Sequence, residues 1–337
     1  MRLLYLNFLV KYHAMTQAKN IALLYGGTSS ERDISLLSGK NVGEALASRG
    51  HKVVYIDPKN PADMEILERG PFDIAYIALH GKGGEDGVIQ AHLEKLGIPY
   101  TGSKVESSAC AMNKAATKDK YLAANVPTAE YCVVNKGESF DVDNIIGVTG
   151  EDVVVKAAHE GSSIGLYFAN GADEIAQAID SAFEFDNVVL VEKRIPGREF
   201  TCAVLEFSTE DQARLSDKLN FEGNAASLPV IEIVPKNEYY DFASKYDEGG
   251  SEHICPAKIS DELSDVIKKE ALKAHKCLNC AGFSRTDFRV NENAEVFALE
   301  TNTIPGMTSK SLVPDAARAV GIGFEDLCEL IVNNELM

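Results

Sequence analysis

The sequence predicts an α/β protein, because strand-like hydrophobic runs alternate with segments of helical periodicity along most of its length. The chain has 337 residues, of which 45% are hydrophobic and 25% charged. Such a chain can bury a sizeable core divided over two or three domains. The opening strand–helix–strand pattern is typical of a doubly wound sheet, whose ligands bind at the carboxyl ends of strands.

Composition excludes several classes of protein. The net charge of −18 disfavours nucleic acid and acidic membranes as partners, so an anionic substrate needs a local pocket of Lys and Arg. The seven cysteines form no paired CxxC motifs, which suits a reducing cytoplasm and argues against zinc. No apolar run approaches membrane-spanning length. Residues 1–19 read as an extension upstream of a second start at Met15, since their apolar run lacks a cleavage site.

Two loops follow predicted strands in the first part of the chain. NIALLYGG (20–27) is a buried strand, followed by a helix that ends near Gly50 and by strands KVVYID and DIAYIALHG. The predicted buried face of that helix carries Ile34, Leu37, Val42, Ala45 and Leu46. In GGTSSER, Glu31 either binds an ammonium group or favours the helix N-terminus electrostatically. In LHGKGGEDG, His80 is either a ligand-orienting group or a turn residue, and the turn is favoured.

The middle of the chain combines a lysine with a glycine- and serine-rich loop. A helix predicted over 104–125 carries Lys114, which by itself is typical of a surface lysine. Strand VVVK ends at Lys156 and runs into EGSSIG, which supplies hydroxyls and backbone N–H groups for a triphosphate. The alternative is a plain hairpin connection, and no Walker A motif is present. A helix over 172–183 and strand VVLVEK follow, ending at Glu192 and Lys193.

The later segments mix strands, loops and helices. GREFTCAVLEF is a predicted strand with Glu199 near its start. Residues 208–227 read as an insertion or a long hairpin loop, and residues 239–257 as a long mobile loop that closes over a site. Helices are predicted over 261–278 and from residue 311 to the C-terminus.

A hairpin between these helices carries the strongest site signal. FSRTDFRV and EVFALE flank a polar turn, which predicts a β-hairpin. Side chains alternate along a strand, so Arg285 and Asp287 are expected on the same face of the first strand, and Ala298 and Glu300 on the same face of the second. Pairing about the turn then brings Asp287 near Glu300, with Asn302 just beyond. Two carboxylates and an amide suit Mg²⁺, and Arg285 suits an anion or an oxyanion. The alternative is a solvated hairpin with surface charges.

Five motifs occur in the order GGTSSER, ALHGKGGEDG, VVVK…EGSSIG, YYDFASKY and RTDF…ETNTIPGMTSKSLVP. In this order they resemble the D-alanine–D-alanine ligases of the ATP-grasp superfamily, from Asn20 to the C-terminus. The resemblance implies a three-domain ATP-grasp architecture, with a Rossmann-like N-terminal domain and nucleotide held between two antiparallel sheets. The domains implied are 20–103, 104–192 and 193–337. It also implies ATP-dependent joining of two D-alanines through a D-alanyl phosphate, for peptidoglycan precursors in the cytoplasm, by a homodimer that uses two Mg²⁺ or Mn²⁺.

The resemblance also assigns roles to residues. The metal ligands are Asp287, Glu300 and Asn302, and the ATP contacts are Lys114, Lys156, Ser163, Glu192, Lys193, Glu199 and Lys245. Glu31 and His80 match the first D-alanine subsite, whereas Ser311 and Leu312 match the second. Arg285 and the Gly306 N–H match the oxyanion stabilisers, and Ser162 and Tyr246 match partners of Glu31 in a latch that shuts the loop.

Three departures and two alternatives accompany this resemblance. Ala157 stands where proline is common, which loosens that turn, and Arg194 stands where an aromatic residue is common, so the adenine cradle differs in detail. The segment 208–227 is longer than in compact members, and the N-terminal extension is unmatched. One alternative is another ATP-grasp carboxylate–amine ligase with a different amino acid. The other is a non-catalytic nucleotide-binding protein, which is expected to lack a metal ligand or Arg285. Tyr246 favours a D-amino acid as second substrate, because ligases that use D-lactate generally lack it.

Overall fold

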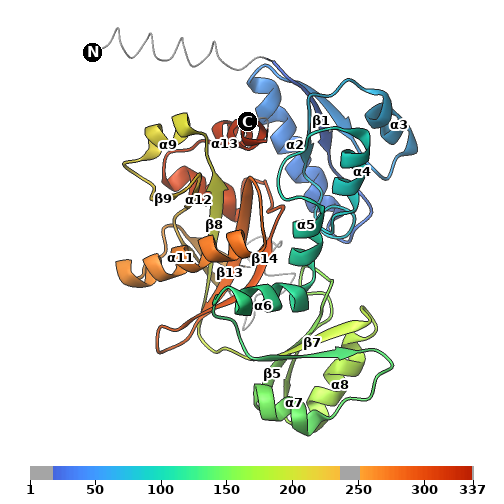
Figure 1. The fold of residues 1–337 in the computed structure, drawn as a ribbon, viewed down its shortest axis with the longest axis vertical. Helices are drawn as coiled ribbons and strands as arrows, with labels where there is room; N and C mark the ends of the chain where they lie inside the picture. Colours follow the sequence, from blue (N-terminus) through green and yellow to red (C-terminus); the bar gives the residue numbers. More distant parts are fainter. Residues whose placement is uncertain (1–17, 236–250, 336–337) are drawn as a thin grey trace.

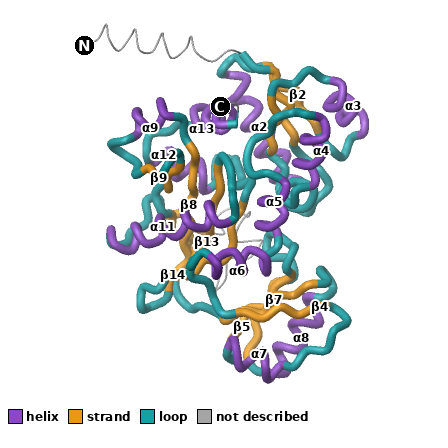
Figure 2. Tube along the Cα trace, viewed as in Figure 1, coloured by secondary structure: helices purple, strands orange, loops and turns teal. Residues whose placement is uncertain are grey.

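The computed structural model describes residues 18–235 and 251–335. Three β-sheets, each with its own helices, form the molecule (Figure 1), and the predicted α/β character is confirmed. Figure 2 shows the lobe formed by residues 131–193, at the lower end, standing apart from the other two sheets. Loops therefore line the junctions between the sheets.

The first sheet is parallel, in the order β2-β1-β3. Its strands are β1 (Asn20–Leu24), β2 (Lys52–Ile56) and β3 (Ile74–Ile77), with helices α2 (Arg32–Ser48), α3 (Pro61–Arg69) and α4 (Val88–Leu96). The predicted buried face of α2 is partly wrong, because Leu37 is exposed whereas Ser35, Ser38 and Gly39 are buried. A Cβ on Gly39 would lie 2.4 Å from Tyr25 Cβ, so small residues allow the helix to approach its sheet closely.

The helix predicted over 104–125 is two helices, α5 (Val105–Met112) and α6 (Lys114–Ala123). Asn113 separates them with extended backbone, and its side chain accepts a hydrogen bond from the Ala116 N–H. An asparagine that caps the second helix competes with the continuous helix that the periodicity predicts. The start of α6 is thereby fixed beside the site described below.

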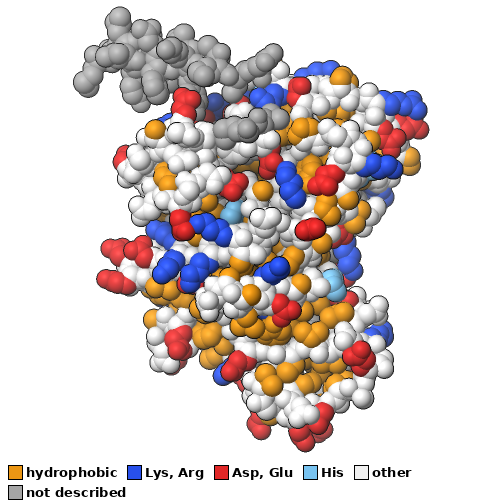
Figure 3. Space-filling model, in the orientation of Figure 1, with side chains coloured by type: hydrophobic (Ala, Val, Ile, Leu, Met, Phe, Trp, Pro, Cys, Tyr) orange, Lys and Arg blue, Asp and Glu red, His pale blue; other side chains and the backbone are white. Residues whose placement is uncertain are grey.

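The second sheet is antiparallel, in the order β4-β7-β5-β6, and it carries α7 and α8. In Figure 3 the tip of this lobe, formed by its two helices, presents Asp and Glu side chains. The predicted strands at 153–156 and 188–193 and the helix at 172–183 are confirmed. The bounds are β4 (Tyr131–Asn135), β5 (Asp152–Ala157), β6 (Leu166–Asn170), β7 (Val188–Lys193), α7 (Val142–Thr149) and α8 (Ala172–Ala182).

The third sheet has seven described strands, with the central strand β8 (Arg198–Glu206) pairing with β10, β11 and β13. Residues 208–227 are not a long loop, since they form α9 (Thr209–Leu215) and two short strands. The predicted mobile loop falls largely outside the described residues, but its end is a strand. The remaining bounds are β9 (Phe221–Glu222), β10 (Ala225–Ser227), β11 (Ile231–Pro235), β12 (Ser251–Ile254), β13 (Phe283–Val290) and β14 (Val296–Asn302).

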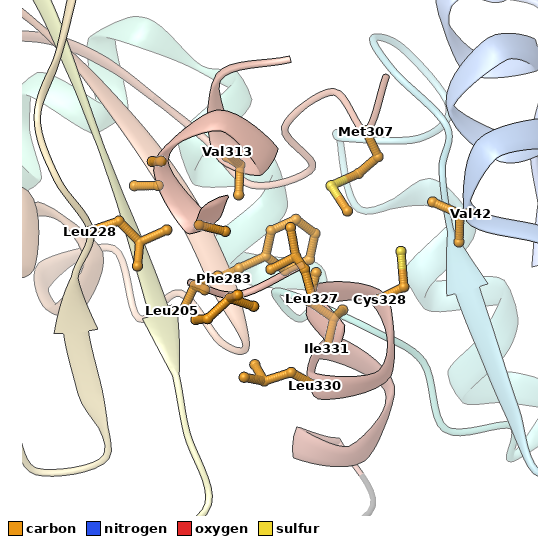
Figure 4. Close-up of a cluster of buried hydrophobic side chains, with 14 of the residues drawn as sticks. Val42, Leu205, Leu228, Phe283, Met307, Val313, Leu327, Cys328, Leu330 and Ile331 are labelled. Carbon is orange, nitrogen blue, oxygen red and sulfur yellow. The ribbon is translucent and has the colours of Figure 1, made fainter. Parts of the chain in front are cut away.

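Helix α11 (Asp261–Cys277) lies along the third sheet, whereas the last segment joins that sheet to the first. The C-terminal helix is two helices, α12 (Leu312–Ala319) and α13 (Phe324–Asn334), because Gly321 adopts a φ of +83° between them. Figure 4 shows the buried side chains of α13, including Leu327 and Cys328, between Val42 of α2 and Leu205 of β8. One core therefore connects the first and third sheets.

Candidate active site

Two neighbouring pockets lie where the three sheets meet. The inter-sheet pocket, of about 310 Å³, is lined by Lys156 and Glu192 of the second sheet and by Glu199, Asp287 and Glu300 of the third. The loop pocket, of about 330 Å³, is lined by residues that follow strands of the first sheet and by the segment after β14. Both pockets share the side chains or backbone of Lys114, Glu160, Gly161, Ser162 and Glu300.

The predicted hairpin of β13 and β14 is confirmed, and Asp287 lies directly opposite Glu300. The strict alternation predicted for the second strand is wrong. Phe288 pairs with Ala298, so Leu299 is an extra residue in a β-bulge. Ala298 therefore faces the core with Phe288, while Leu299 and Glu300 both line the inter-sheet pocket. The bulge directs Glu300 into the pocket.

Asp287 lies at the centre of a hydrogen-bonded group. Arg285 donates to both carboxylate oxygens, from Nε at 2.9 Å and from a terminal nitrogen at 2.8 Å. Thr201 Oγ1 donates at 2.6 Å, and Asn302 Nδ2 at 3.2 Å. The structure thus brings together all three predicted metal ligands and Arg285.

The donor chemistry of this group fits a hard cation. Asp287, Glu300 and Asn302 supply two carboxylates and an amide at a pocket wall, which is the set that Mg²⁺ accepts together with phosphate oxygens. No group of three His, Cys, Asp or Glu side chains that could hold a metal gathers within residues 18–235 and 251–335. A cation at the hairpin would therefore need the Asn302 amide oxygen, or oxygens of a bound substrate, in addition to the two carboxylates.

Glu192 lies between two lysines at the wall of the inter-sheet pocket. Lys156 forms an ion pair with one carboxylate oxygen, and Lys118 pairs with the other at 2.7 Å. Burial alone would raise the pKa of Glu192, but the two ammonium groups outweigh burial and hold this pKa at about 2. The sequence analysis missed Lys118, although its spacing of four residues from Lys114 places both on one helix face.

Glu31 enters the loop pocket from the start of α2. A Cβ on Gly161 would lie 2.6 Å from Glu31 Oε1, so a side chain at residue 161 would displace the carboxylate from this position. The next two residues, Ser162 and Ser163, adopt φ values of +49° and +63°. Left-handed backbone at consecutive serines is uncommon and is often found at ligand-binding loops. The EGSSIG segment is thus a strained hairpin connection that lines both pockets.

His80 is buried and holds the segment after β14. Its Nδ1–H donates to the Ile304 carbonyl at 3.0 Å, and its Nε2 accepts from the Ser38 hydroxyl at 2.9 Å. Ser38 Oγ in turn accepts the Met307 N–H at 3.2 Å. Burial lowers the pKa of His80, which suits this neutral tautomer. His80 lines the loop pocket, and with Ser38 it also fixes the backbone on both sides of Gly306. The sequence had predicted either a ligand-orienting group or a turn residue, and neither prediction included this role.

Glu85, which the sequence analysis also missed, lines the same pocket. Its Oε2 accepts the Gly81 N–H at 2.7 Å. Burial, with the nearby Glu31 carboxylate, raises the pKa of Glu85 to about 8. Its position five residues after His80, within LHGKGGEDG, is the sequence signal that could have identified it.

The second-substrate residues lie at the far wall of the loop pocket. Ser311 Oγ accepts the Thr308 N–H at 2.9 Å, and Leu312 begins α12. A Cβ on Gly306 would lie 2.9 Å from Ser311 Oγ, so the glycine allows the two segments to approach. Gly306, Ser311 and Leu312 all line this pocket.

The remaining predicted residues divide between the inter-sheet pocket and the undescribed segment. Lys114 lies 3.5 Å from Glu300 and donates to the Glu160 carbonyl. Glu199 pairs with Arg289 at 3.3 Å, and Lys193 with Glu130 at 3.2 Å. Ser163 also lines the pocket. Lys245 and Tyr246 lie outside the described residues, so the predicted loop contacts stay predictions.

Comparisons with known proteins match this geometry to one family. The profile for the D-ala D-ala ligase C-terminus matches residues 121–333, and that for the D-ala D-ala ligase N-terminus matches residues 59–103. A D-alanine–D-alanine ligase of Halalkalibacterium halodurans is 44% identical over 321 residues, which cover 94% of this chain and 99% of the relative. The chain belongs to the D-alanine–D-alanine ligase family.

Other members of the D-alanine–D-alanine ligase family are similar over comparable lengths. The enzyme of Geobacter sulfurreducens is 44% identical over 313 residues, covering 93% of this chain and 92% of the relative. The crystal structure of the Bacillus anthracis ligase has a TM-score of 0.79 at 31% identity, covering 95% and 98% of the two chains. VanG D-Ala:D-Ser ligase from Enterococcus faecalis has the same TM-score at 27% identity, covering 95% and 100%.

The fold agrees with these relatives in its mixed α/β architecture with antiparallel sheets. Within the described ranges, no helix combines the length and the apolar character needed to cross a membrane.

Proposed function

We propose that this chain joins two molecules of D-alanine in an ATP-dependent reaction that releases ADP and phosphate. The observation that carries the proposal is the shared boundary of the two pockets at Lys114, Gly161, Ser162 and Glu300. A nucleotide in the inter-sheet pocket and an amino acid in the loop pocket would meet there. The family membership and the solved ATP complex of the Bacillus anthracis relative support the nucleotide assignment.

The nucleotide is proposed to lie between the second and third sheets. Lys114 and Lys156 supply positive charge for its phosphates, and Ser163 supplies a hydroxyl and an N–H. Glu192, Lys193 and Glu199 are proposed to contact the base and ribose. Asp287, Glu300 and Asn302 would hold Mg²⁺ or Mn²⁺, which neutralises charge on a transferring phosphate when bound.

Glu31 is proposed to hold the ammonium group of the first D-alanine, so that the carboxylate of this D-alanine is directed to the shared boundary. An oxygen of the D-alanine carboxylate attacks the γ-phosphorus of ATP, and the bond between the γ-phosphorus and the bridging oxygen of ADP breaks. The amine of the second D-alanine, bound at Ser311 and Leu312, then attacks the carbonyl carbon of the resulting acyl phosphate. Arg285 and the Gly306 N–H stabilise the oxyanion, after which phosphate leaves and the amine loses its proton.

The side chains around this reaction centre arrange its parts. Asp287 fixes the plane of the Arg285 guanidinium through two hydrogen bonds. His80 and Ser38 hold the backbone at residues 304 and 307, which limits movement of the Gly306 N–H between them. Lys245, and the latch of Tyr246 with Ser162 and Glu31, are proposed to close the site.

The chain is proposed to comprise three domains at 20–103, 104–192 and 193–337, and to act as a cytoplasmic homodimer for peptidoglycan precursors. Helix α6 nevertheless packs on the third sheet, where Tyr121 shares a hydrophobic cluster with Phe200. Part of the proposed second domain, helix α6, therefore shares a hydrophobic core with the proposed third domain.

The proposal is tested by measuring phosphate release and product mass with ATP, Mg²⁺ and D-alanine. Release that requires D-alanine, with a dipeptide product, is expected. Equal activity with L-alanine would contradict the substrate assignment, and a product formed preferentially from D-alanine and D-serine would change the second substrate.

A further inference from the structure

Lys118 is a buried lysine for which the proposed reaction has no role. Residue 118 is 0% exposed, and it lies one helical turn after Lys114 on α6. Its ammonium group donates to Thr128 Oγ1 at 2.7 Å and to the Ala129 carbonyl at 3.2 Å, and it pairs with Glu192 at 2.7 Å. Two hydrogen bonds and one ion pair thus hold the Lys118 ammonium group in place.

Lys118 and Lys156 share one carboxylate but differ in access. The Lys156 side chain is 13% exposed and lines the inter-sheet pocket, whereas Lys118 lies behind the pocket wall. The buried trio with Glu192 has one positive charge in excess. A buried carboxylate without a cation is strongly destabilised, so Glu192 must keep one lysine at all times.

We infer that Lys118 is a positioning residue that keeps Glu192 neutralised, so that Lys156 can leave this carboxylate and bind a nucleotide phosphate. Lys156 can exchange partners because it reaches the pocket. Lys118 cannot, because its three contacts hold it in the wall. The inference rests on the proposed binding of ATP in the inter-sheet pocket.

The contacts of Lys118 also reach the hairpin that carries Glu300. Thr128 accepts from Lys118 and donates its own hydroxyl proton to the Ala298 carbonyl at 2.7 Å. The Ala298 N–H donates to the Pro127 carbonyl at 2.7 Å. Residues 127–129 therefore join the fixed lysine to β14.

The test replaces Lys118 with Met and measures ATP binding by calorimetry, together with the KM values for ATP and D-alanine. Without Lys118, Glu192 retains Lys156, so ATP affinity is expected to fall at least about tenfold. The KM for D-alanine is expected to stay within about twofold, which a general loss of structure would not produce. Lys120→Met, at an exposed lysine on the same helix, is the matched control and should leave both values unchanged.

A double-mutant cycle separates this role from simple loss of charge. Glu192→Gln alone removes a proposed nucleotide contact, whereas in the Lys118→Met background it also releases Lys156. The loss of ATP affinity caused by Glu192→Gln should therefore be smaller in that background. Additive losses, or unchanged ATP affinity in Lys118→Met, would overturn the inference.

Two further results keep the test decisive. If Lys118→Met does not fold, Lys118→Gln keeps amide donors for Thr128 and Ala129 while removing the charge, and the same loss of affinity is expected. Unchanged ATP affinity in that variant also overturns the inference. If the wild-type chain itself fails to bind ATP, both the proposed function and this inference fail. If the wild-type chain binds ATP and Lys118→Met binds it with the same affinity, only this inference fails.

Discussion

At the scale of single residues, the contact between Gly161 and Glu31 offers a sharp test of the first subsite. In Gly161→Ala, the added methyl group would lie 2.6 Å from Glu31 Oε1 and displace the carboxylate. Steady-state kinetics should show a rise of about tenfold or more in the KM for D-alanine, equivalent to about 1.4 kcal/mol. Gly147→Ala places its methyl group in open space within α7 and should leave this KM unchanged. An unaltered KM in Gly161→Ala would remove Glu31 from the subsite.

Glu300 permits a test of the proposed cation site. Glu300→Gln keeps the size of the side chain but removes the charge opposite Asp287. Titration with Mg²⁺ should show a half-saturating concentration at least about tenfold higher and a lower kcat. Glu292→Gln, at an exposed position in the turn of the same hairpin, serves as control. An Mg²⁺ titration that coincides with the wild type would exclude Glu300 as a ligand.

Residue patterns predicted the convergence of Asp287, Glu300 and Asn302, because alternation and a short turn determine which side chains meet across a hairpin. Lys118 could not be predicted in the same way. Buried lysines are rare, and the carboxylate that stabilises this one is 74 residues away in the chain. Such a pairing depends on tertiary structure.

At the scale of elements, Glu192 joins β7 to β5 and α6 through ion pairs, which makes stability depend on acid. Its pKa is lowered from 4.5 to about 2 in the folded protein. The stabilisation, about 3 kcal/mol, is therefore fully present above pH 4.5 and is lost as pH falls towards about 2. Glu192→Gln should be less stable than the wild type at pH 7, and the difference should narrow across this window.

Denaturant unfolding of both proteins between pH 7 and the lowest pH at which they stay folded measures that difference. A gap that stays constant as the pH falls below 4.5 would show that the carboxylate charge does not stabilise the fold.

Elements with a clear period were predicted well, and the misses have local causes. Strands β1, β5, β7 and β13 follow from hydrophobic runs. The break at Asn113 was missed because a cap inside an otherwise helical pattern is decided by what the second helix packs against. The bulge at Leu299 inserts one residue without changing the composition of the strand. Residues 208–227 lacked periodicity because their elements are short.

At the scale of the whole molecule, α13 joins the first and third sheets into one core. Leu327 is fully buried there, so Leu327→Ala should cost about 2–5 kcal/mol of the free energy of unfolding. Leu122→Ala, at a leucine that is 56% exposed, should change it by less than about 0.5 kcal/mol. Denaturant unfolding followed by circular dichroism measures both. Equal effects of the two substitutions would contradict a shared core.

The arrangement of the three sheets could not be predicted from the hydrophobic periodicity of individual helices and strands. The order of five separated motifs, by resemblance, predicted the family and the architecture, whereas the pairing order β2-β1-β3 and the position of α13 required the structure. The two pockets meet because Lys114 of α6, the loop after β5 and Glu300 of β14 line both of them.

The path of oxygen tests the joint use of the two pockets most directly. D-Alanine labelled with heavy oxygen in its carboxylate is supplied with unlabelled ATP and Mg²⁺, and the released phosphate is analysed by mass spectrometry. If the carboxylate attacks the γ-phosphorus across the shared boundary, each phosphate leaves with one labelled oxygen. Phosphate that carries no label, formed together with the dipeptide, would contradict direct transfer between the two pockets.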